Sequence, residues 1–493
     1  MIQETARQSL ETRTGEAFGS PLRPRVAVAV ALIGGLATVS ACSGGPPVEM
    51  GGPMTLSTGN ASNPTVAVSE NGVRYVAWVQ TNADGGDVYL STVGADGVPA
   101  GTPVRVNDIP GDADPHEQAP PQVALSPEGD VVVVWQRKVE APWLDYGGAD
   151  LRFARSTDGG RSFLPAVTVN DNASESPVRI SFHDIAFGQD GAIFVSWIDA
   201  RVRDSAREQA YREGVSNDSM SSDGSTDQGM SSAGMTGDSM ASAGMPHEGM
   251  SNGSMSHDAM SHDGAAARML PLDEEPGTEI RLTVSHDGGA TFAPSLVIDG
   301  ITCPCCRTSL ATGPDGVVYV AWRKVFDGGI RDIAVARSTD GGATFGPVRR
   351  VHTDDWEFDG CPHAGPSLAL DADGRLHVAW YTGKPDSQGL WYAVSDDNGE
   401  SFSEPIAILT DSFVPASQAR LGIVDGEVWV AWDDLRTDTP KVGFGTISGG
   451  RLNTVGGGFE GHAPSLTVSG TRGALAWLDN DEVRMVSLAT PED

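Results

Sequence analysis

Basic residues and long apolar runs are both scarce in this sequence. Its 493 residues include 33 lysines and arginines against 66 aspartates and glutamates, a formal net charge of −33. That surplus repels nucleic acid and anionic membranes, so we expect no nucleic-acid partner and favour cations or basic partners. The apolar run at residues 26–39 is shorter than the ~20 residues that a membrane-spanning helix needs. The sequence therefore predicts no transmembrane helix there.

The first 42 residues have the pattern of an export signal. A basic region precedes the apolar run, and Val-Ser-Ala-Cys follows it at residues 39–42. This motif resembles the bacterial lipobox, which implies that Cys42 is acylated and holds the protein in the cell envelope, at the outer membrane or periplasm of a Gram-negative cell. An ordinary cleaved signal with a chance cysteine is the alternative. Residues 43–53, rich in Gly and Pro, are predicted to be a flexible tether.

A short motif recurs four times. The copies are STDGGRSF (156–163), SHDGGATF (285–292), STDGGATF (338–345) and SDDNGESF (395–402). Each lies between strand-like segments, and its Asp and Gly predict a tight turn with positive φ, under which the Phe can pack. The four copies resemble the Asp-boxes, or BNR repeats, of the sialidase-like β-propellers. The resemblance implies a propeller for nearly all of the exported chain.

A second repeat predicts the number of blades. Seven β-branched segments, such as RYVAW and VYVAW, end in a tryptophan: Trp78, Trp135, Trp197, Trp322, Trp380, Trp432 and Trp477. Their spacing outside the insertion is ~45–60 residues, as expected of four-stranded blades. We predict an all-β fold, a single propeller over residues 54–490 with seven blades; six blades is the alternative. The last blade lacks an outer strand, which MTLST from Met54 would supply.

Charged residues follow several of these tryptophans, in WIDAR, WRK and WDDLR. We expect them to be strand-end charges at a solvated blade edge, because charged side chains are seldom buried.

Cysteine and histidine residues are expected to meet on one rim of the propeller. In a blade whose strands run A to D from the axis outward, the D-to-A and B-to-C connections share one face. CPCCR (303–307) and GCPHAGP (360–366) fall in successive D-to-A connections. The predicted metal ligands are Cys303, Cys305, Cys306, Cys361 and His363, with His116, His183 and His462 as weaker rim candidates. Two disulfides among the four cysteines are the alternative in an oxidising compartment.

The insertion at residues 204–277 interrupts the third blade on the same rim, and it is predicted to be disordered. Its Met residues recur every five positions among Gly, Ser, Asp and His, which gives no helical stripe. Thioethers favour Cu(I), and imidazole adds capacity for Cu(II) or Zn(II). The segment resembles the Met/His-rich copper-binding tracts of bacterial periplasmic copper-resistance proteins. Its candidate ligands are Met235, Met240, Met245, His247, Met250, Met255, His257, Met260 and His262.

These features predict a copper-handling protein. The loop would capture Cu(I) and pass it to the cysteines, with a copper ion or a copper-handling envelope protein as the partner, and binding should weaken in acid because thiolates bind the metal. A low-complexity linker without ligand function is the alternative for the insertion.

The resemblance to sialidases also implies a hydrolase alternative. That family holds the substrate carboxylate with an arginine triad and uses a Tyr nucleophile with a Glu partner and an Asp acid/base. Weak candidates here are Arg179, Arg307, Arg420, Tyr146 and Tyr381. The first blade lacks the arginine motif expected there, and no Tyr–Glu pair can be assigned. A non-catalytic scaffold that binds glycan or protein is a third possibility, because fold does not determine function.

Overall fold

The computed structural model describes residues 48–491, apart from residues 63, 84, 145, 173–175 and 213–276. Cys42 and the predicted Met and His ligands of the insertion lie outside the described residues. The described residues belong to one compact unit. No helix in the described ranges is both long enough and apolar enough to cross a bilayer.

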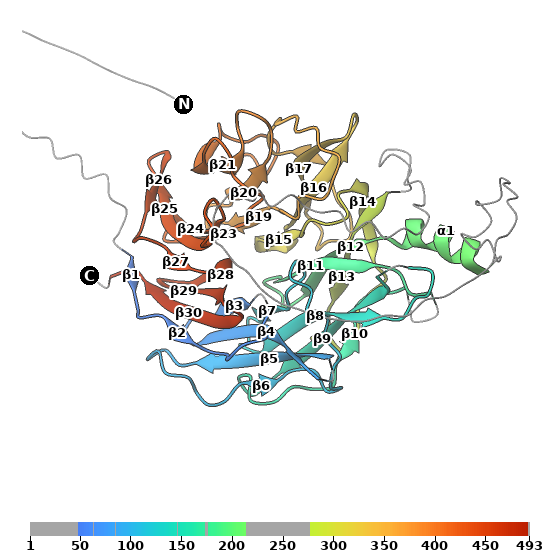
Figure 1. Ribbon diagram of the computed structural model, residues 1–493, viewed down its shortest axis with the longest axis horizontal. Helices are drawn as coiled ribbons and strands as arrows, with labels where there is room; N and C mark the ends of the chain where they lie inside the picture. The colour runs from blue at the N-terminus through green and yellow to red at the C-terminus, as the bar shows by residue number, and fades with distance from the viewer. Residues whose placement is uncertain are drawn as a thin grey trace, which may run out of the picture. The chain divides into compact units, whose positions relative to one another are not determined.

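Antiparallel sheets of four strands follow one another along the chain (Figure 1). The first contains β3 (Thr65–Val68), β4 (Arg74–Asn82), β5 (Gly85–Val93) and β6 (Val104–Arg105). The second contains β7 (Gln122–Leu125), β8 (Val131–Val139), β9 (Gly148–Ser156) and β10 (Val167–Thr168).

The next two four-strand sets are joined into one sheet, because β14 also pairs with β16 through Thr302 and Lys324. One set contains β11 (Ile180–Phe187), β12 (Ile193–Asp199), β13 (Thr278–Ser285) and β14 (Leu296–Thr302). The other contains β15 (Ser309–Thr312), β16 (Val318–Phe326), β17 (Ile330–Ser338) and β18 (Arg349–Arg350), with the 3-10 turn η2 (Pro314–Gly316) between its first two strands.

Three further sheets complete the unit. The first contains β19 (Ser367–Leu370), β20 (Leu376–Thr382), β21 (Gly389–Ser395) and β22 (Ile406–Thr410). The second contains β23 (Ala419–Val424), β24 (Glu427–Asp434), β25 (Lys441–Ser448), β26 (Arg451–Thr454) and β27 (Phe459–Glu460). The third contains β28 (His462–Ser469), β29 (Arg472–Asp479) and β30 (Glu482–Ala489).

The N-terminal strands complete the last sheet. β1 (Glu49–Met50) and β2 (Met54–Thr55) both pair with β30, and they cover an edge that would otherwise expose unpaired backbone groups. The predicted closing strand at Met54 is confirmed. The predicted tether at 43–53 is wrong for Glu49 and Met50, because these residues already pair with Ala489 and Leu488.

The first strands of successive sheets contact one another in the order β3, β7, β11, β15, β19, β23 and β28, and β28 returns to β3. The apolar cores lie between neighbouring sheets: Trp78 of the first sheet, for example, packs in one cluster with Ala476 and Met485 of the last. An almost entirely β unit of four-stranded sheets, with neighbouring sheets sharing cores, is the arrangement expected of a β-propeller.

The four Asp-box turns have a common hydrogen-bond pattern. In the first, the Ser156 hydroxyl donates to Asp158 Oδ1 (2.8 Å) and accepts from the Gly160 amide, while Ser162 donates from its amide and hydroxyl to the Asp158 carboxylate. These hydrogen bonds, led by that of the Ser162 hydroxyl, lower the Asp158 pKa to about 2. Phe163 packs against an intersheet core. The predicted turn is confirmed.

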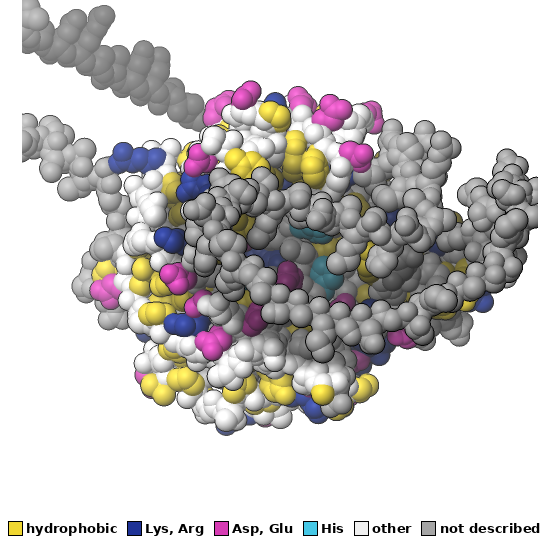
Figure 2. Space-filling model, in the orientation of Figure 1, with side chains coloured by type: hydrophobic (Ala, Val, Ile, Leu, Met, Phe, Trp, Pro, Cys, Tyr) yellow, Lys and Arg dark blue, Asp and Glu magenta, His cyan; other side chains and the backbone are white. Residues whose placement is uncertain are grey.

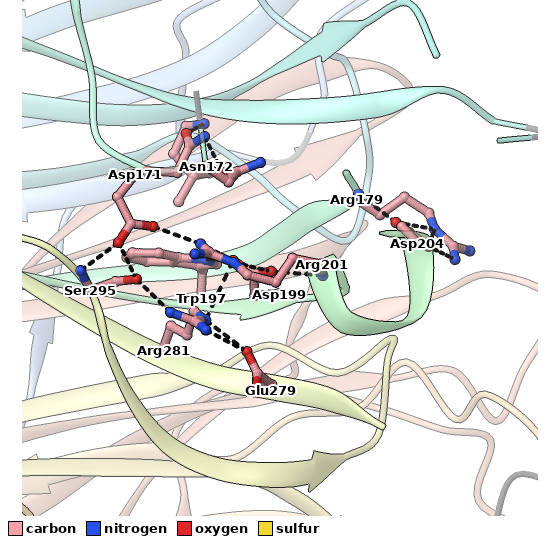
Figure 3. Close-up of polar contacts among 12 residues, drawn as sticks. Asp171, Asn172, Arg179, Trp197, Asp199, Arg201, Asp204, Glu279, Arg281 and Ser295 are labelled. Atoms are coloured by element: carbon pink, nitrogen blue, oxygen red, sulfur yellow. Dashed lines mark hydrogen bonds and ion pairs between the residues drawn. The ribbon is translucent and has the colours of Figure 1, made fainter. Parts of the chain in front are cut away.

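The insertion begins with a helix. α1 (Arg201–Arg212) follows β12, so the prediction of disorder from residue 204 is wrong for residues 204–212. Asp204 is fully buried and accepts hydrogen bonds from the backbone amide of Arg179 (2.8 Å) and from its guanidinium (Figure 3). This pair fixes the first turn of the helix to β11.

The prediction that the charged residues after the tryptophans are solvated is wrong for Asp199, Arg323 and Asp433, whereas Arg436 is exposed as predicted. Asp199 is fully buried and accepts hydrogen bonds from Trp197 Nε1 (2.9 Å) and Arg201 (Figure 3). Arg323 and Asp433 are also buried. These three side chains hydrogen-bond to neighbouring segments instead of facing water: Arg323 donates to the Ala364 carbonyl, for example, and Asp433 accepts from the Ala463 amide.

Candidate functional site

Two connections between sheets place the four cysteines. Residues 303–307 join β14 to β15, and the Cys303 amide donates to the Arg323 carbonyl (2.9 Å). Residues 360–366 join β18 to β19. The two connections touch at Gly365, where an added Cβ would lie 2.2 Å from the Arg307 carbonyl oxygen. Glycine at that position therefore allows the Cys361 segment to lie against the Cys303–Cys306 segment.

Three buried thiols converge in the first connection. Cys303 Sγ lies 3.5 Å from Cys305 Sγ and 3.6 Å from Cys306 Sγ, and the three sulfur atoms are all within 4.8 Å of one another. Cys361 is exposed, and its thiol hydrogen-bonds with that of Cys305. All four cysteines are free thiols. We call these four residues the thiol cluster; the predicted meeting of the two cysteine segments is present in the structure.

Two buried guanidinium groups support the thiol cluster. Arg331 is 1% exposed and donates from Nη1 to Cys303 Sγ (2.9 Å) and from Nε to the Phe358 carbonyl (2.7 Å). Arg323, also 1% exposed, donates only to carbonyl oxygens, including that of Ala364. Among the described residues neither group has a carboxylate partner, so the positive charge beside the sulfur atoms is not balanced by an acid.

This environment shifts the pKa values of the three buried cysteines in different directions. Hydrogen bonds from the Cys305 and Cys306 thiols, with the charge of Arg331, hold the pKa of Cys303 well below its usual value. Hydrogen bonding to Cys303 raises the pKa of Cys305, and burial raises that of Cys306. Of the three buried cysteines, Cys303 therefore loses its proton most readily.

The spacing of the sulfur atoms suits a metal–thiolate site. Metal–sulfur bonds of about 2.3 Å around one tetrahedral ion place the sulfur atoms roughly 3.8 Å apart. The observed distances of 3.5 and 3.6 Å are close to that value. Sulfur-only donors select soft ions such as Cu(I) over Mg²⁺ or Ca²⁺, which prefer oxygen.

The predicted histidine ligands lie in surroundings that differ from one another. His363 is exposed, and its carbonyl, not its ring, is engaged by Gln418 Nε2 (2.9 Å). His183 lies inside β11, buried, with Nε2 3.1 Å from the Val134 carbonyl, and burial lowers its pKa to about 4. His462 is the first residue of β28. In the described part of the chain, none of these rings belongs to the group of ligand atoms that surrounds Cys303.

His116 lines a cavity of about 230 Å³. The cavity is lined by His116, Asp114, Tyr146, Arg179 and Pro304, among others, and we call it the rim pocket. Pro304 lies between Cys303 and Cys305 in the chain, so the rim pocket borders the connection that carries the buried thiols.

A second polar group lies where the inner strands meet. Arg307, Arg420 and Asp184 line a channel of about 190 Å³, which we call the axial channel. Burial raises the pKa of Asp184 to about 6, and burial with the nearby Arg420 lowers that of Arg307 to about 9. Burial also raises the pKa of Asp433, which faces Arg307. Figure 2 shows histidine and acidic side chains in the hollow at the centre of the displayed face.

The hydrolase candidates do not form one site. Arg307 and Arg420 meet in the axial channel, but Arg179 pairs with Asp204 and lines the rim pocket. The buried Tyr381 hydroxyl donates to the Val414 carbonyl (2.8 Å). Tyr146, 83% exposed, lies at the rim pocket. Arg307 itself donates to the Gln118 carbonyl (2.8 Å), so its guanidinium is partly engaged by backbone.

Sequence reasoning missed Arg323, Arg331, Asp184 and Asp433. Arg323 and Asp433 directly follow a core tryptophan, a position that could have marked them as buried. Arg331 and Asp184 lie within strands, and no local signal in the sequence distinguishes them from surface charges.

Several solved structures are similar to this chain. No family model matches the sequence, and no curated protein matches it. A polysaccharide lyase described as an ulvan lyase is 12% identical with a TM-score of 0.49, over 89% of this chain and 95% of that one. A Hadza microbial sialidase is 12% identical (TM-score 0.45, 84% and 76%), and a Penicillium chrysogenum alpha-L-arabinanase complexed with arabinobiose is 13% identical (TM-score 0.43, 75% and 92%).

The names of these three proteins describe carbohydrate-active enzymes and mention no copper. At this level of similarity, however, no activity can be transferred to this chain.

Proposed function

We propose that this protein binds copper as Cu(I) at the thiol cluster. The observation that supports this most strongly is the convergence of Cys303, Cys305 and Cys306, buried and within 4.8 Å of one another, beside the exposed Cys361. Thiolates are the donors that select soft ions. Arg331, which has no acidic partner among the described residues, would offset the negative charge of a copper–thiolate complex.

The wider proposal concerns delivery and location. The Met and His residues of the insertion would capture Cu(I) and pass it to Cys361, the accessible member of the cluster, by ligand exchange. Cys42 would carry a lipid that anchors the protein in the envelope, and a copper-handling envelope protein would supply or accept the ion. We also propose seven blades, because the ring of contacting first strands runs from β3 to β28 and back to β3.

Copper binding can be tested with the full chain carrying Cys42→Ser, so that the four cluster cysteines are the only thiols. The reduced protein is loaded anaerobically with Cu(I), and bound copper is measured after gel filtration. We expect Cys303→Ser to remove the copper held most tightly, as judged by competition with a Cu(I) chelator, and deletion of residues 213–276 to remove further, weaker equivalents. His286→Ala, on an exposed Asp-box turn, is the matched control.

Equal copper content in the parent protein and Cys303→Ser would contradict the proposal. So would an absence of bound copper in a protein whose four thiols titrate as free, because the donors would then be present without affinity.

A second candidate function is binding or cleavage of an acidic carbohydrate. It is favoured by the pairing of Arg307 and Arg420 with Asp184 in the axial channel, since Arg binds carboxylate or sulfate and a carboxyl group with pKa about 6 can exchange protons near neutral pH. Uronic-acid, sulfated and sialylated glycans should be screened for binding and product release. Loss of a detected activity in Arg420→Lys, with copper content unchanged, would support this function; no binding or product with any of them would exclude it for those glycans.

A further inference from the structure

The thiol cluster contains a pair of thiols with the spacing of a redox dithiol. Cys303 and Cys306 are separated by two residues, a Cys-X-X-Cys spacing, and their sulfur atoms are 3.6 Å apart. A disulfide bond is about 2.05 Å long, so the two sulfur atoms would need to approach by roughly 1.5 Å. Because both belong to the same short connection, that approach requires no movement of one sheet against another.

A metal ion that oxidises this pair needs donor atoms near the same connection. The rim pocket borders Pro304, and its lining includes His116 and Asp114, which carry nitrogen and oxygen donors of the kind that Cu(II) takes, together with Arg179 and Arg203. A cupric ion in the rim pocket would therefore lie next to the connection that carries the dithiol.

We propose that the thiol cluster reduces Cu(II) to Cu(I). The two thiols of Cys303 and Cys306 react with two cupric ions to give one disulfide, two cuprous ions and two protons. Both S–H bonds break, the S–S bond forms, and each copper ion gains one electron. This inference rests on copper as the ligand of the cluster, and it adds a chemical step that produces the oxidation state favoured by thiolate and thioether ligands.

The remaining thiols offer a route for restoring the pair. Cys305 Sγ is 3.5 Å from Cys303 Sγ, and the Cys305 thiol hydrogen-bonds with that of the exposed Cys361. Thiol–disulfide exchange through Cys305 would move the oxidised pair to Cys305 and Cys361 while conserving one disulfide. Two equivalents of an external thiol would then reduce that bond at the surface and be released as their own disulfide.

The experiment uses the reduced full chain with Cys42→Ser, mixed anaerobically with Cu(II) sulfate and an excess of a chromogenic Cu(I) chelator. Cu(I) is followed by absorbance, the remaining thiols are titrated after denaturation, and the disulfide is located by peptide mapping. We expect one Cu(I) for each thiol lost in the first phase and a Cys303–Cys306 disulfide. Cys306→Ser should slow this phase at least tenfold, whereas His286→Ala should not change it.

Random disulfides, or a rate in the parent protein no greater than in Cys306→Ser, would overturn the inference. Peptide mapping of the parent protein keeps the test decisive even if Cys306→Ser fails to fold. After the first phase, glutathione should restore the thiols, and Cys361→Ser should slow that step about tenfold; equal rates would overturn the route through Cys361.

This test is separate from the test of the proposed function. A protein that binds Cu(I) but does not reduce Cu(II) would retain the proposed function and contradict the inference. Reduction without retention of Cu(I) would contradict the proposed function instead.

Discussion

Asp184 should make the stability of the protein depend on pH between about 4 and 7. Its carboxylate accepts hydrogen bonds from the amides of Leu310 (2.8 Å) and Ile185 (3.0 Å), and it faces Arg420 and Arg307 in the axial channel. Burial outweighs these favourable contacts and raises the pKa from 3.8 to about 6. The folded protein therefore holds this proton more tightly than the unfolded chain does.

The direction and size of the effect follow from that difference. Below pH 3.8 the carboxyl group is protonated in both states, and as the pH rises through about 6 the folded state bears the cost of a buried charge. At about 1.4 kcal/mol for each pH unit between the two pKa values, the loss reaches about 3 kcal/mol by pH 7. This value is an upper bound, because the carboxylate borders a channel that can hold water.

The perturbation is Asp184→Asn, and the measurement is urea unfolding of variant and parent, followed by tryptophan fluorescence from pH 4 to pH 7. The lost hydrogen bond lowers the stability of the variant by a similar amount at every pH. The unfolding free energy of the variant minus that of the parent should therefore increase with pH by up to about 3 kcal/mol. The exposed Asp190→Asn is the control. A difference that stays constant over this range would refute the reasoning.

Three further perturbations test the fold. Gly289→Ala should lower the thermal midpoint by several degrees, because φ at Gly289 is +86° and the added Cβ would lie 2.1 Å from Phe153. The control Gly52→Ala, with open space around the added Cβ, should leave the midpoint unchanged. Equal midpoints for the two variants would contradict this packing. Asp340→Asn should lower the thermal midpoint at pH 5, because the Thr344 hydroxyl and amide stabilise the ionised carboxylate of Asp340. The difference between variant and parent should vanish as the pH falls from 3.8 through about 2, and a difference that does not depend on pH would refute this. Deletion of residues up to β2 should expose the edge of β30 and promote self-association in light scattering, and a monodisperse, equally stable product would argue against its closing role.

The sequence contained enough information to predict the architecture because its signals are local and repeated. Each Asp-box specifies a turn through its own Ser, Asp and Gly, and each β-branched segment ending in tryptophan specifies a buried second strand. The closing strand at Met54 was predictable because the last repeat lacked an outer strand. The prediction that disorder starts at residue 204 failed, because the first turn of α1 is held by the contact of Asp204 with Arg179, which lies 25 positions earlier in the chain.

The candidate site was predictable only in part. The similar positions of CPCCR and GCPHAGP in successive repeats indicated that Cys303 and Cys361 would meet. The choice between thiols and disulfides depends on sulfur positions, which no spacing pattern specifies. Arg331 was not predictable either, because its contact with Cys303 joins residues 28 positions apart and its own segment has the pattern of an ordinary strand.

The pairing of Glu49 with Ala489 also has a consequence for chain topology. The two ends of the described chain are therefore paired neighbours. The fold should keep its sheets if these ends are joined and the chain is opened at another position. A short peptide joining these ends, with new termini opened in an exposed turn such as that after Gly449, should give a circular permutant with the same sheets. In such a permutant the pairing of β2 with β30 would become a local, hairpin-like contact. A different pair of strands would then have to close the longest loop during folding, in place of residues that are now more than 400 positions apart.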